Sequence, residues 1–412
     1  LQTDGQGHAD ADRPRPGLLQ VWGPTGPVCV ALHWTGPLVL GREAPSHALD
    51  DPRTSRRHCR VDFDGALWTV EDLGSRNGTL VDGARIDGRV RLDEGQALRV
   101  GHCVFVVDPD LRRRTGVAVE PDRIAGDAFA AALRAATRRA AAGEPLLVVG
   151  PTGAGKHRVA RHYHQAARGA HPLLPLAPRR LVEDSAVAAV REAVRAAGDG
   201  TLLLSGVEDL GAAAQALLLP LCEPGARPGL CVLARDDLRP QVQRGRLRED
   251  LYFRLRAVMT DVPALAHRVE EVAFHVAQVL AAAGTRAQPS LVERCVRLPW
   301  PGNVRELRAE LEVAAAAARQ EGLDEVAARH LRAGAGELAD PPARGPSIVS
   351  AERLGDPAHV RAVLLAEGGN VRAAARALGV HRNQLRRWIE RAGIDPREPG
   401  RAADGPILPP RR

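Results

Sequence analysis

Lys156 is the only lysine in a chain with 56 arginines, and it lies in a glycine-rich segment. The apolar run 146–149 comes directly before this segment, as a buried strand would. A strand, a glycine-rich turn and a lysine are typical of a loop whose backbone N–H groups surround phosphate. A compact ammonium also reaches between phosphate oxygens in a way that a planar guanidinium does not. The expected nucleotide-binding residues are Gly150, Pro151, Thr152, Gly153, Ala154, Gly155, Lys156 and His157.

An inherited loop that no longer binds is the alternative for this segment, and its surroundings favour a working α/β core. A helix around 127–142 precedes the strand, and further strands are expected at 201–204 and 230–233, with helical segments between them. Alternating strands and helices predict an α/β nucleotide-binding fold. After about residue 263 the pattern becomes helical, which predicts a lid subdomain.

The region before this core has the texture of a small β-sandwich. The apolar segments 61–63 and 67–70 flank Asp64 and Gly65, a pair typical of a hairpin turn. Asn-Gly and Asp-Gly pairs follow at short spacing, and another apolar strand is expected at 104–107. Regular short strands with tight turns predict two packed sheets.

The C-terminal region predicts two short helices around a glycine-bearing turn. Apolar residues recur at helical spacing in the first helix, Gly379 can close it, and a second apolar face follows. Such a pair is a candidate helix-turn-helix. The apolar positions are Val371, Ala374, Ala375 and Leu378 in the first helix and Leu385, Trp388 and Ile389 in the second.

Three motifs on the β background resemble those of forkhead-associated domains, which bind phosphothreonine peptides. They are Gly41-Arg42, Ser55-Arg56-Arg57-His58 and Asp72-Leu73-Gly74-Ser75-Arg76-Asn77-Gly78-Thr79. The resemblance implies that Arg42 and Ser55 contact the phosphate, that Arg56 supports the pocket and that Asn77 holds the peptide backbone. A forked guanidinium and a hydroxyl donor suit a phosphate dianion. His58 is expected to brace a loop, and Asn77-Gly78 by itself would indicate only a hairpin turn.

Two further motifs and the phosphate loop resemble the AAA+ ATPase domain of bacterial sigma-54-dependent enhancer-binding activators. The motifs are Leu247-Arg248-Glu249-Asp250-Leu251-Tyr252-Phe253-Arg254-Leu255 and Leu298-Pro299-Trp300-Pro301-Gly302-Asn303-Val304-Arg305-Glu306-Leu307. Members of this family form rings and remodel the sigma-54 polymerase complex. The resemblance implies that Arg248 and Arg254 act on a neighbouring subunit's nucleotide and that Arg305 touches nucleotide from the lid. A subunit interface or solvated helix charges are the alternatives for Arg248 and Arg254.

The sequence departs from this family at the positions that carry catalysis. Ser205 and Gly206 align with the family's Asp-Glu pair, which holds magnesium and polarises water, and a hydroxyl and a hydrogen do neither. Glu208 and Asp209 follow at a displacement too large for in-line chemistry. Arg235 aligns with the family's polar first sensor, an Asn. We therefore expect ATP binding with hydrolysis lost and no confident catalytic residue, and we leave magnesium open.

Contact with sigma-54 RNA polymerase is doubtful for a related reason. The Gly-Ala-Phe-Thr-Gly-Ala loop with which the family grips sigma-54 does not occur in the sequence. The interval from Lys156 to Ser205 is also too short by about a helix and a loop.

The segment 369–389 resembles the Fis-type helix-turn-helix that closes these activators. Asn and Gln can pair with adenine edges and Arg with guanine, while other arginines hold phosphates. We expect a homo-oligomer that reads paired half-sites. A helical hairpin that docks on the lid is the alternative. The predicted DNA-binding residues are Arg382, Asn383, Gln384, Arg386 and Arg387.

Charge and cysteine use agree with a cytoplasmic DNA-binding protein. The net charge is +7, and 11 arginines against five acidic residues from position 357 onward carry most of it. The six cysteines are scattered without a CxxC pair, so we expect no metal site and no disulfide framework. No apolar run is long enough to cross a membrane, so no membrane partner is expected. Because the chain begins with Leu, we expect the recorded start to be incomplete.

The sequence thus predicts a multidomain protein with a forkhead-associated β-sandwich, a P-loop AAA+-like α/β core with a helical lid, and an all-α helix-turn-helix. The function expected is a bacterial transcription regulator that couples recognition of a phosphothreonine protein or Ser/Thr kinase to sequence-specific DNA binding. An active ATPase that remodels sigma-54 RNA polymerase is one alternative, and a phosphopeptide-binding scaffold without DNA binding is another. The expected bounds are 1–16 disordered, 17–107 sandwich, 108–121 linker, 122–262 core, 263–332 lid, 333–357 linker, 358–394 helix-turn-helix and 395–412 disordered basic tail.

Overall fold

The computed structural model describes most of the chain before residue 338 and part of the C-terminal region. The described residues are 14–65, 67–120, 123–178, 183–337 and 357–367, with residues 371, 374, 385, 389 and 394. They fall into two units, divided between Leu338 and Ala339. The tail predicted as disordered at 395–412, and the first 13 residues of the predicted N-terminal one, lie outside the described residues.

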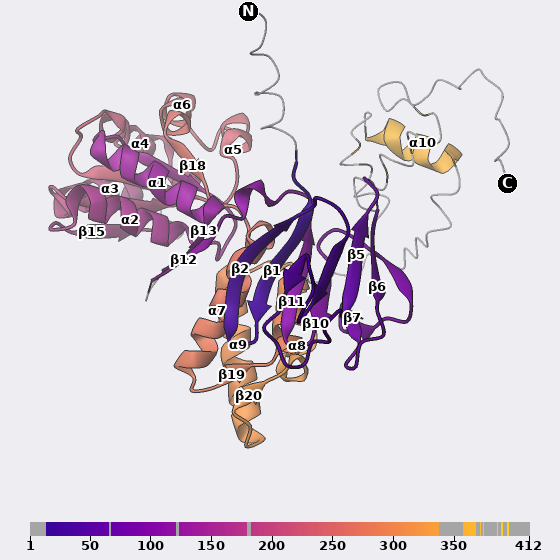
Figure 1. Cartoon of the computed structure of the whole chain (residues 1–412). Helices are drawn as coiled ribbons and strands as arrows, with labels where there is room; N and C mark the ends of the chain where they lie inside the picture. The colour runs from indigo at the N-terminus through magenta and orange to yellow at the C-terminus, as the bar shows by residue number, and fades with distance from the viewer. Residues whose placement is uncertain are drawn as a thin grey trace, which may run out of the picture. The chain divides into compact units, whose positions relative to one another are not determined.

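The N-terminal domain is a β-sandwich, as the sequence predicts (Figure 1). One sheet has the order β2-β1-β11-β10-β7-β8, and the other has the order β4-β3-β5-β6-β9. The expected hairpin is present, because Phe63 pairs with Trp68 across the turn. The strands are β1 Gly17–Gly23, β2 Gly26–His33, β3 Leu38–Gly41, β4 His47–Ala48, β5 Cys59–Phe63, β6 Trp68–Asp72, β7 Thr79–Val81, β8 Ala84–Arg85, β9 Arg89–Leu92, β10 Ala97–Val100 and β11 Cys103–Asp108.

The segment expected to be a plain linker has structure of its own. It contains the 3₁₀ helix η1 (Leu111–Arg113) and strand β12 (Val117–Glu120), which pairs with β13 (Arg123–Gly126). Arg114 anchors the segment, since its guanidinium donates to Asp108 at the end of β11 and to Glu270. An ion pair between elements that are distant in the sequence leaves no periodic pattern of residues, so the sequence could not predict how this segment is held.

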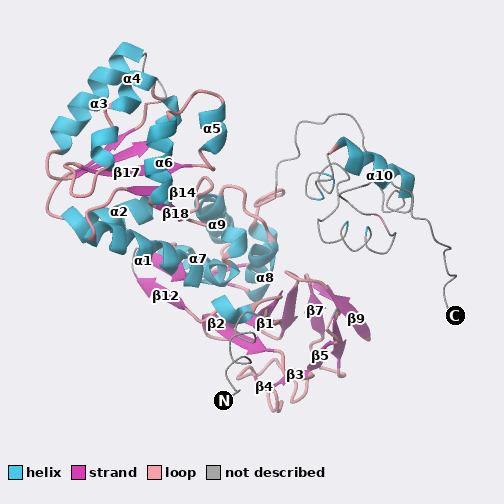
Figure 2. Ribbon diagram, turned by 90° about the horizontal axis from the view of Figure 1, so that it is seen from above, coloured by secondary structure: helices cyan, strands magenta, loops and turns pink. Residues whose placement is uncertain are grey.

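The central domain is a five-stranded parallel sheet with helices on both faces, shown in Figure 2. Helices α1 and α2 cover one face, and α3, α4 and α6 cover the other. The strands, in the order β15-β16-β17-β14-β18, are β14 Leu146–Val149, β15 Leu173–Leu176, β16 Thr201–Ser205, β17 Gly229–Ala234 and β18 Met259–Asp261. The helices are α1 Asp127–Ala141, α2 Lys156–Arg168, α3 Glu183–Ala197, α4 Ala212–Ala216, α5 Arg239–Gln243 and α6 Glu249–Ala257, with 3₁₀ turns η2 Val207–Asp209 and η3 Leu219–Cys222.

Sequence periodicity found the three central strands of this sheet and missed its two edges. Strand β15 contains Pro175 and is only partly buried, so it lacks the continuous apolar run of a central strand. Strand β18 is three residues long, and two of them are exposed. Edge strands with few buried side chains leave little pattern in a sequence.

The lid that follows is helical, apart from a short parallel pair of two-residue strands. Trp300 is buried at its centre; its indole N–H donates to the Cys295 carbonyl and its backbone N–H to the Gly336 carbonyl. Residues 333–337, expected to begin a linker, therefore pack onto the lid. The elements are η4 Leu265–His267, α7 Val269–Ala282, β19 Arg286–Ala287, α8 Pro289–Arg297, α9 Asn303–Gln320, β20 Glu325–Val326 and η5 Ala328–His330.

The sandwich packs on the lid through one of its sheets. Strands β1, β2, β10 and β11 contact α7 and α8, and apolar residues of both domains form one continuous core. Trp22 and Val106 lie in the same buried cluster as Val276 and Leu291. Shared burial of apolar surface of this kind holds two domains together.

The second unit contains α10 (Pro357–Ala366) and a small apolar cluster. Val371, Ala374, Leu385 and Ile389 all contribute to that cluster, as the predicted helix faces require. Ala375, Leu378 and Trp388 lie outside the described residues. Among the helices that the structure describes, none is long and apolar enough to span a membrane.

Candidate nucleotide and phosphopeptide sites

The predicted phosphate loop lies at the carboxyl end of β14, between β17 and β18. Gly153 and Gly155 have φ values of 77° and 113°, in the left-handed region that favours glycine. Gly153 also lies against the lid, because a Cβ there would meet the Gly302 carbonyl oxygen at 2.0 Å. Helix α2 begins at Lys156, so its first N–H groups face the loop, as in an anion-binding helix terminus.

A cavity of about 640 Å³ opens beside this loop, a size suited to a nucleotide. Thr152 to His157 line it from the core, and Arg305 lines it from α9 of the lid. The structure therefore brings together the predicted loop residues and the predicted lid arginine. Gly150 and Pro151 do not line the cavity, and they contribute carbonyl groups beneath Lys156.

The Lys156 ammonium is folded back onto its own loop. Its Nζ donates to the Gly150 carbonyl at 2.6 Å and to the Pro151 carbonyl at 3.0 Å. Burial lowers the pKa of Lys156; the Asp236 carboxylate opposes this effect, while repulsion by Arg235 and Arg305 adds to it. A bound phosphate would oppose this lowering of the pKa by pairing with the ammonium.

The lid is tied to the loop by two buried side chains. Asn303 Nδ2 donates to the Thr152 carbonyl at 2.9 Å, while its Oδ1 accepts from the Leu265 N–H at 2.7 Å. Arg268 Nη2 donates to the Ala154 carbonyl at 2.8 Å. Movement of the lid would therefore move the loop, because these bonds join them directly.

Further basic residues line the cavity beyond those predicted from the sequence. Arg158 and Arg161 follow Lys156 on α2, and Arg308 follows Arg305 by one turn of α9. Helical spacing of three residues from Arg305 was a signal that could have found Arg308, whereas Arg158 and Arg161 lie two and five residues after Lys156 and had no such signal. Among the described residues, the seven cations in the cavity wall are Lys156, Arg158, Arg161, Arg235, Arg268, Arg305 and Arg308.

The position of the expected acidic pair is occupied by Ser205 and Gly206, both of which line the cavity. Glu208 lines it as well, from the 3₁₀ turn η2 that directly follows Gly206. That its displacement from the family's acidic position is too large for in-line chemistry stays a prediction. Oε2 of Glu208 is buried and has no hydrogen-bond partner among the described residues. Asp209 does not line the cavity.

Arg248 and Arg254 lie outside this cavity. Arg248 pairs with Asp250 at 2.7 Å, and Arg254 pairs with Glu223; all four side chains are exposed. Within one chain, Arg248 and Arg254 therefore form surface ion pairs. Their expected action on the nucleotide of a neighbouring subunit stays a prediction.

The predicted phosphopeptide residues lie on three adjacent loops of the sandwich. Ser55 Oγ accepts from the Arg76 N–H at 3.1 Å, and Asn77 Nδ2 donates to the Arg53 carbonyl at 2.5 Å. Buried His58 braces these loops, with Nδ1 facing the Ser55 N–H and Nε2 facing the Gly78 carbonyl. Burial lowers the pKa of His58, which favours the neutral ring that this pairing needs.

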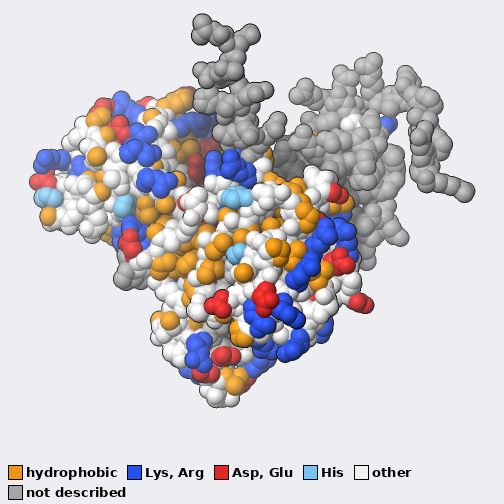
Figure 3. All heavy atoms as spheres, viewed as in Figure 1, with side chains coloured by type: hydrophobic (Ala, Val, Ile, Leu, Met, Phe, Trp, Pro, Cys, Tyr) orange, Lys and Arg blue, Asp and Glu red, His pale blue; other side chains and the backbone are white. Residues whose placement is uncertain are grey.

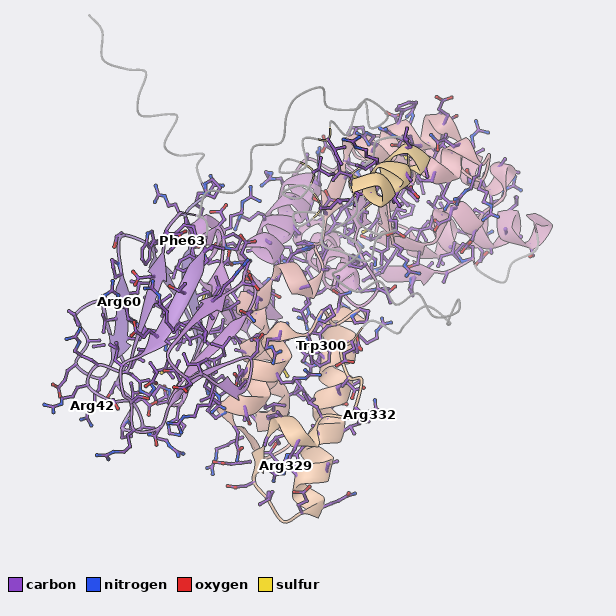
Figure 4. All side chains as sticks on the ribbon, turned by 90° about the vertical axis from the view of Figure 1, so that its right-hand side faces the viewer. Arg42, Arg60, Phe63, Trp300, Arg329 and Arg332 are labelled. Carbon is purple, nitrogen blue, oxygen red and sulfur yellow. The ribbon has the colours of Figure 1, made fainter. Side chains whose placement is uncertain are left out.

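This end of the sandwich is basic and open to solvent. Basic side chains gather over the sandwich on the face shown in Figure 3. Arg42 extends outward from the end of the sandwich opposite Phe63, as Figure 4 shows. The exposed arginines of the three loops are Arg42, Arg53, Arg56, Arg57 and Arg76.

Asn77 and Arg53 also face the lid. They line a cavity of about 680 Å³ whose other wall includes Arg286, Gln288 and Ser290. The predicted peptide-binding loops therefore adjoin both solvent and the lid. By contrast, the predicted DNA-binding residues Arg382, Asn383, Gln384, Arg386 and Arg387 lie outside the described residues.

Comparison with known families matches three separate parts of the chain. Residues 38–101 match the FHA domain, residues 130–265 the sigma-54 interaction domain, and residues 360–397 a homeodomain-like domain. These matches agree with the β-sandwich, the α/β core and the apolar helical cluster described above.

Curated relatives are transcriptional regulators. The chain is 27% identical over 285 residues to the transcriptional regulatory protein GlrR of Escherichia coli, which covers 61% of this chain and 63% of GlrR. It is 32% identical over 301 residues to the acetoin catabolism regulatory protein of Cupriavidus necator, covering 63% and 45% of the two chains. The chain thus spans less than two thirds of either relative.

One solved structure to which the chain is similar is NtrX from Brucella abortus in complex with ADP. It is 24% identical, covers 66% of this chain and 70% of its own, and superposes with a TM-score of 0.47. The relationship of this chain to known regulators rests on the family matches and on the curated relatives. The chain is related to the sigma-54-dependent transcriptional regulators, and it combines an FHA domain, a sigma-54 interaction domain and a homeodomain-like helix-turn-helix domain in that order.

Proposed function

We propose that this protein is a bacterial transcription regulator that couples phosphothreonine recognition to sequence-specific DNA binding through an ATP-binding core that does not hydrolyse ATP. The observation that carries the proposal is the wall of the Lys156 cavity. It keeps the phosphate-binding loop and the lid arginine Arg305, and it has Ser205 and Gly206 where acidic residues would act. Binding and hydrolysis depend on different residues, so one can persist without the other.

ATP binding is supported by the charge and shape of the cavity. Glycines with positive φ, a helix N-terminus and Lys156 all face one side of it. Backbone N–H groups and cations in this arrangement favour polyphosphate. Asn303 and Arg268 link the loop to the lid, so a bound nucleotide would stabilise the closed arrangement of core and lid.

A second candidate is an active ATPase that remodels sigma-54 RNA polymerase, and Glu208 is the observation that favours it. A carboxylate with an unpartnered oxygen in the cavity wall could accept a proton from water. We favour the first candidate because the sigma-54 contact loop is absent from the sequence.

Phosphothreonine recognition is supported by five exposed arginines on the sandwich loops and by the Ser55 hydroxyl beside them. The partner would be a phosphorylated protein, such as a Ser/Thr kinase. DNA binding would use the five polar and basic residues predicted at 382–387. Assembly into a homo-oligomer would pair half-sites and would give Arg248 and Arg254 a neighbouring subunit to contact.

Titration of the purified full chain with ATP, with phosphate release followed in parallel, tests the proposal. We expect saturable binding, loss of binding in Lys156→Ala, and no phosphate release above background. Phosphate release that Lys156→Ala and Glu208→Gln both abolish would instead establish the active ATPase.

A further inference from the structure

The Lys156 cavity is a poor fit for the magnesium ion that accompanies nucleotides in related folds. In P-loop proteins a hydroxyl after the lysine and a carboxylate at the end of a neighbouring strand hold this ion. Here Ser205 ends β16, at the place where that carboxylate would stand, and a neutral hydroxyl carries no charge to a metal. In the part of the chain that the structure describes, no group of three or more His, Cys, Asp or Glu residues could hold a metal.

The cavity wall contains two carboxylates, Glu208 and Glu271, and they do not replace the missing magnesium ligands. Glu271 is already bound, since Arg268 donates to its Oε2 at 2.9 Å and the Gly126 N–H donates to its Oε1 at 2.9 Å. Glu208 remains, with one oxygen unpartnered among the described residues. A single carboxylate would leave the ion held mostly by phosphate and water.

Arg235 stands beside the phosphate loop. It directly follows Ala234, whose carbonyl accepts from the Gly150 N–H at 3.2 Å. Its side chain is 75% exposed, and its ion pair with Asp236 is loose at 3.9 Å. The guanidinium can therefore turn toward a ligand in the cavity that it lines.

Arg305 approaches the loop from the opposite side. Its Cβ lies 3.1 Å from the position that a Cβ at Gly153 would take. Arg305 is exposed, and none of the ion pairs among the described residues involves it. Both arginines repel the Lys156 ammonium and help to lower its pKa. The Asp236 carboxylate offsets part of this repulsion, and an anion bound in the cavity would offset more of it.

We propose that this cavity binds a nucleoside di- or triphosphate as the magnesium-free anion, with Arg235 and Arg305 neutralising the charge that the metal neutralises elsewhere. The inference rests on the proposed function, because it concerns the same nucleotide. A guanidinium pairs with two phosphate oxygens at once and needs no metal to do so. A free nucleotide also carries more negative charge than its magnesium complex, so a wall with seven cations and two carboxylates, which is positive in sum, attracts it more strongly.

Calorimetric titration of the full chain with ATP and ADP, in EDTA and separately in excess magnesium, tests the inference. We expect the Kd in EDTA to be equal to or lower than the Kd in magnesium. Arg235→Asn should weaken binding in EDTA by roughly tenfold, the effect of losing one charge-assisted contact. Arg244→Asn is the matched control, because Arg244 is exposed on α5's C-terminal flank and does not line the cavity.

The outcomes separate this inference from the proposed function. Binding that EDTA abolishes would overturn the inference and leave nucleotide binding intact; its loss in Glu208→Gln would then identify Glu208 as the metal ligand. Unchanged binding by a folded Arg235→Asn variant in EDTA would also overturn it. Absence of ATP binding in both buffers would overturn the proposed function itself.

Discussion

Arg99 of the β-sandwich and Glu293 of the lid form a direct ion pair, with 2.6 Å between Arg99 Nε and Glu293 Oε2. The Glu293 side chain is only 3% exposed, and its other oxygen accepts from the Gly83 N–H at 2.6 Å. Arg297, one turn further along α8, pairs with Asp82 at 2.8 Å. Helix α8 is therefore fixed to the sandwich by polar contacts around a shared apolar core.

Replacing Glu293 with Ala should loosen the sandwich from the lid. The variant leaves the partly buried Arg99 and the Gly83 N–H without their acceptor, so we expect a loss of about 2 kcal/mol or more in the free energy of unfolding. Chemical denaturation measures this loss, and limited proteolysis between the domains reports the loosening.

Glu337→Ala is the matched control for this change. Glu337 pairs with Arg294, which lies on α8 as Glu293 does, but both side chains of this pair are well exposed. Removal of Glu337 should therefore lower the free energy of unfolding by less than about 1 kcal/mol. Equal stabilities for the two variants would show that the buried pair does not hold the domains together.

Arg42→Ala should weaken binding of phosphothreonine peptides to the sandwich. Arg42 is exposed and extends from the loop end, so its loss removes a charge-assisted contact without disturbing the core. We expect at least a tenfold increase in Kd, since such contacts contribute about 1.5–3 kcal/mol. Fluorescence anisotropy with a phosphothreonine peptide library measures the effect.

Arg60→Ala provides the comparison, because Arg60 is an exposed arginine on β5 that pairs with Asp62. Its binding should match that of the unmodified protein. If both variants bind as the unmodified protein does, or if unphosphorylated peptides bind equally well, the proposed phosphate contact is wrong.

Sequence patterns predicted the fold where burial was continuous and failed where structure depends on contacts between distant residues. Strands β14, β16 and β17 are buried throughout or nearly so, and each was found. The packing of the sandwich on the lid could not be predicted, because Arg99 and Glu293 are 194 residues apart and neither is unusual in its local sequence.

The residues of the candidate site also fall into those that the local sequence could predict and those that only the tertiary structure brings to the cavity. Gly153, Gly155 and Lys156 carry a local spacing that specifies a phosphate loop, so the sequence was enough. Glu208 lines the cavity from η2, a 3₁₀ turn whose geometry the residue count does not specify. Arg268 reaches the loop from α7, and only the tertiary structure brings them together.

Restoring the acidic pair by Ser205→Asp with Gly206→Glu should not restore hydrolysis. Gly206 has φ of 82°, and a Cβ there would lie 2.8 Å from Asp209 Oδ2. A side chain in this conformation costs about 1–2 kcal/mol, and the Asp209 carboxylate must also shift to make room for it.

Phosphate release and thermal unfolding together check this expectation. We expect a lowered melting temperature and no turnover, whereas Ser205→Asp alone should fold normally because Ser205 is an ordinary strand residue. ATP turnover by a stable double variant would show that the loss of two side chains alone, rather than the backbone, removed catalysis.

Glu270 should make stability depend on pH near neutrality. Its side chain is fully buried on α7 and accepts from Arg114 Nη1 at 2.5 Å, with Glu271 and Arg268 nearby. Burial outweighs the attraction of Arg114 and raises the pKa of Glu270 to about 7. Between the unfolded value of 4.5 and about 7, the unfolded state is ionised while the folded state keeps its proton. The free energy of unfolding must therefore fall as pH rises through this window, by at most about 3 kcal/mol, and level off above it.

Glu270→Gln removes this titration, so the stability difference between the unmodified protein and the variant should decline with pH and then become constant. Denaturation curves at several pH values measure the difference. Glu312→Gln, at an exposed position of α9, is the control and should show no such decline. A difference that rises with pH would mean that Arg114 keeps Glu270 ionised in the folded protein, because an acid with a depressed pKa gains stability as pH increases.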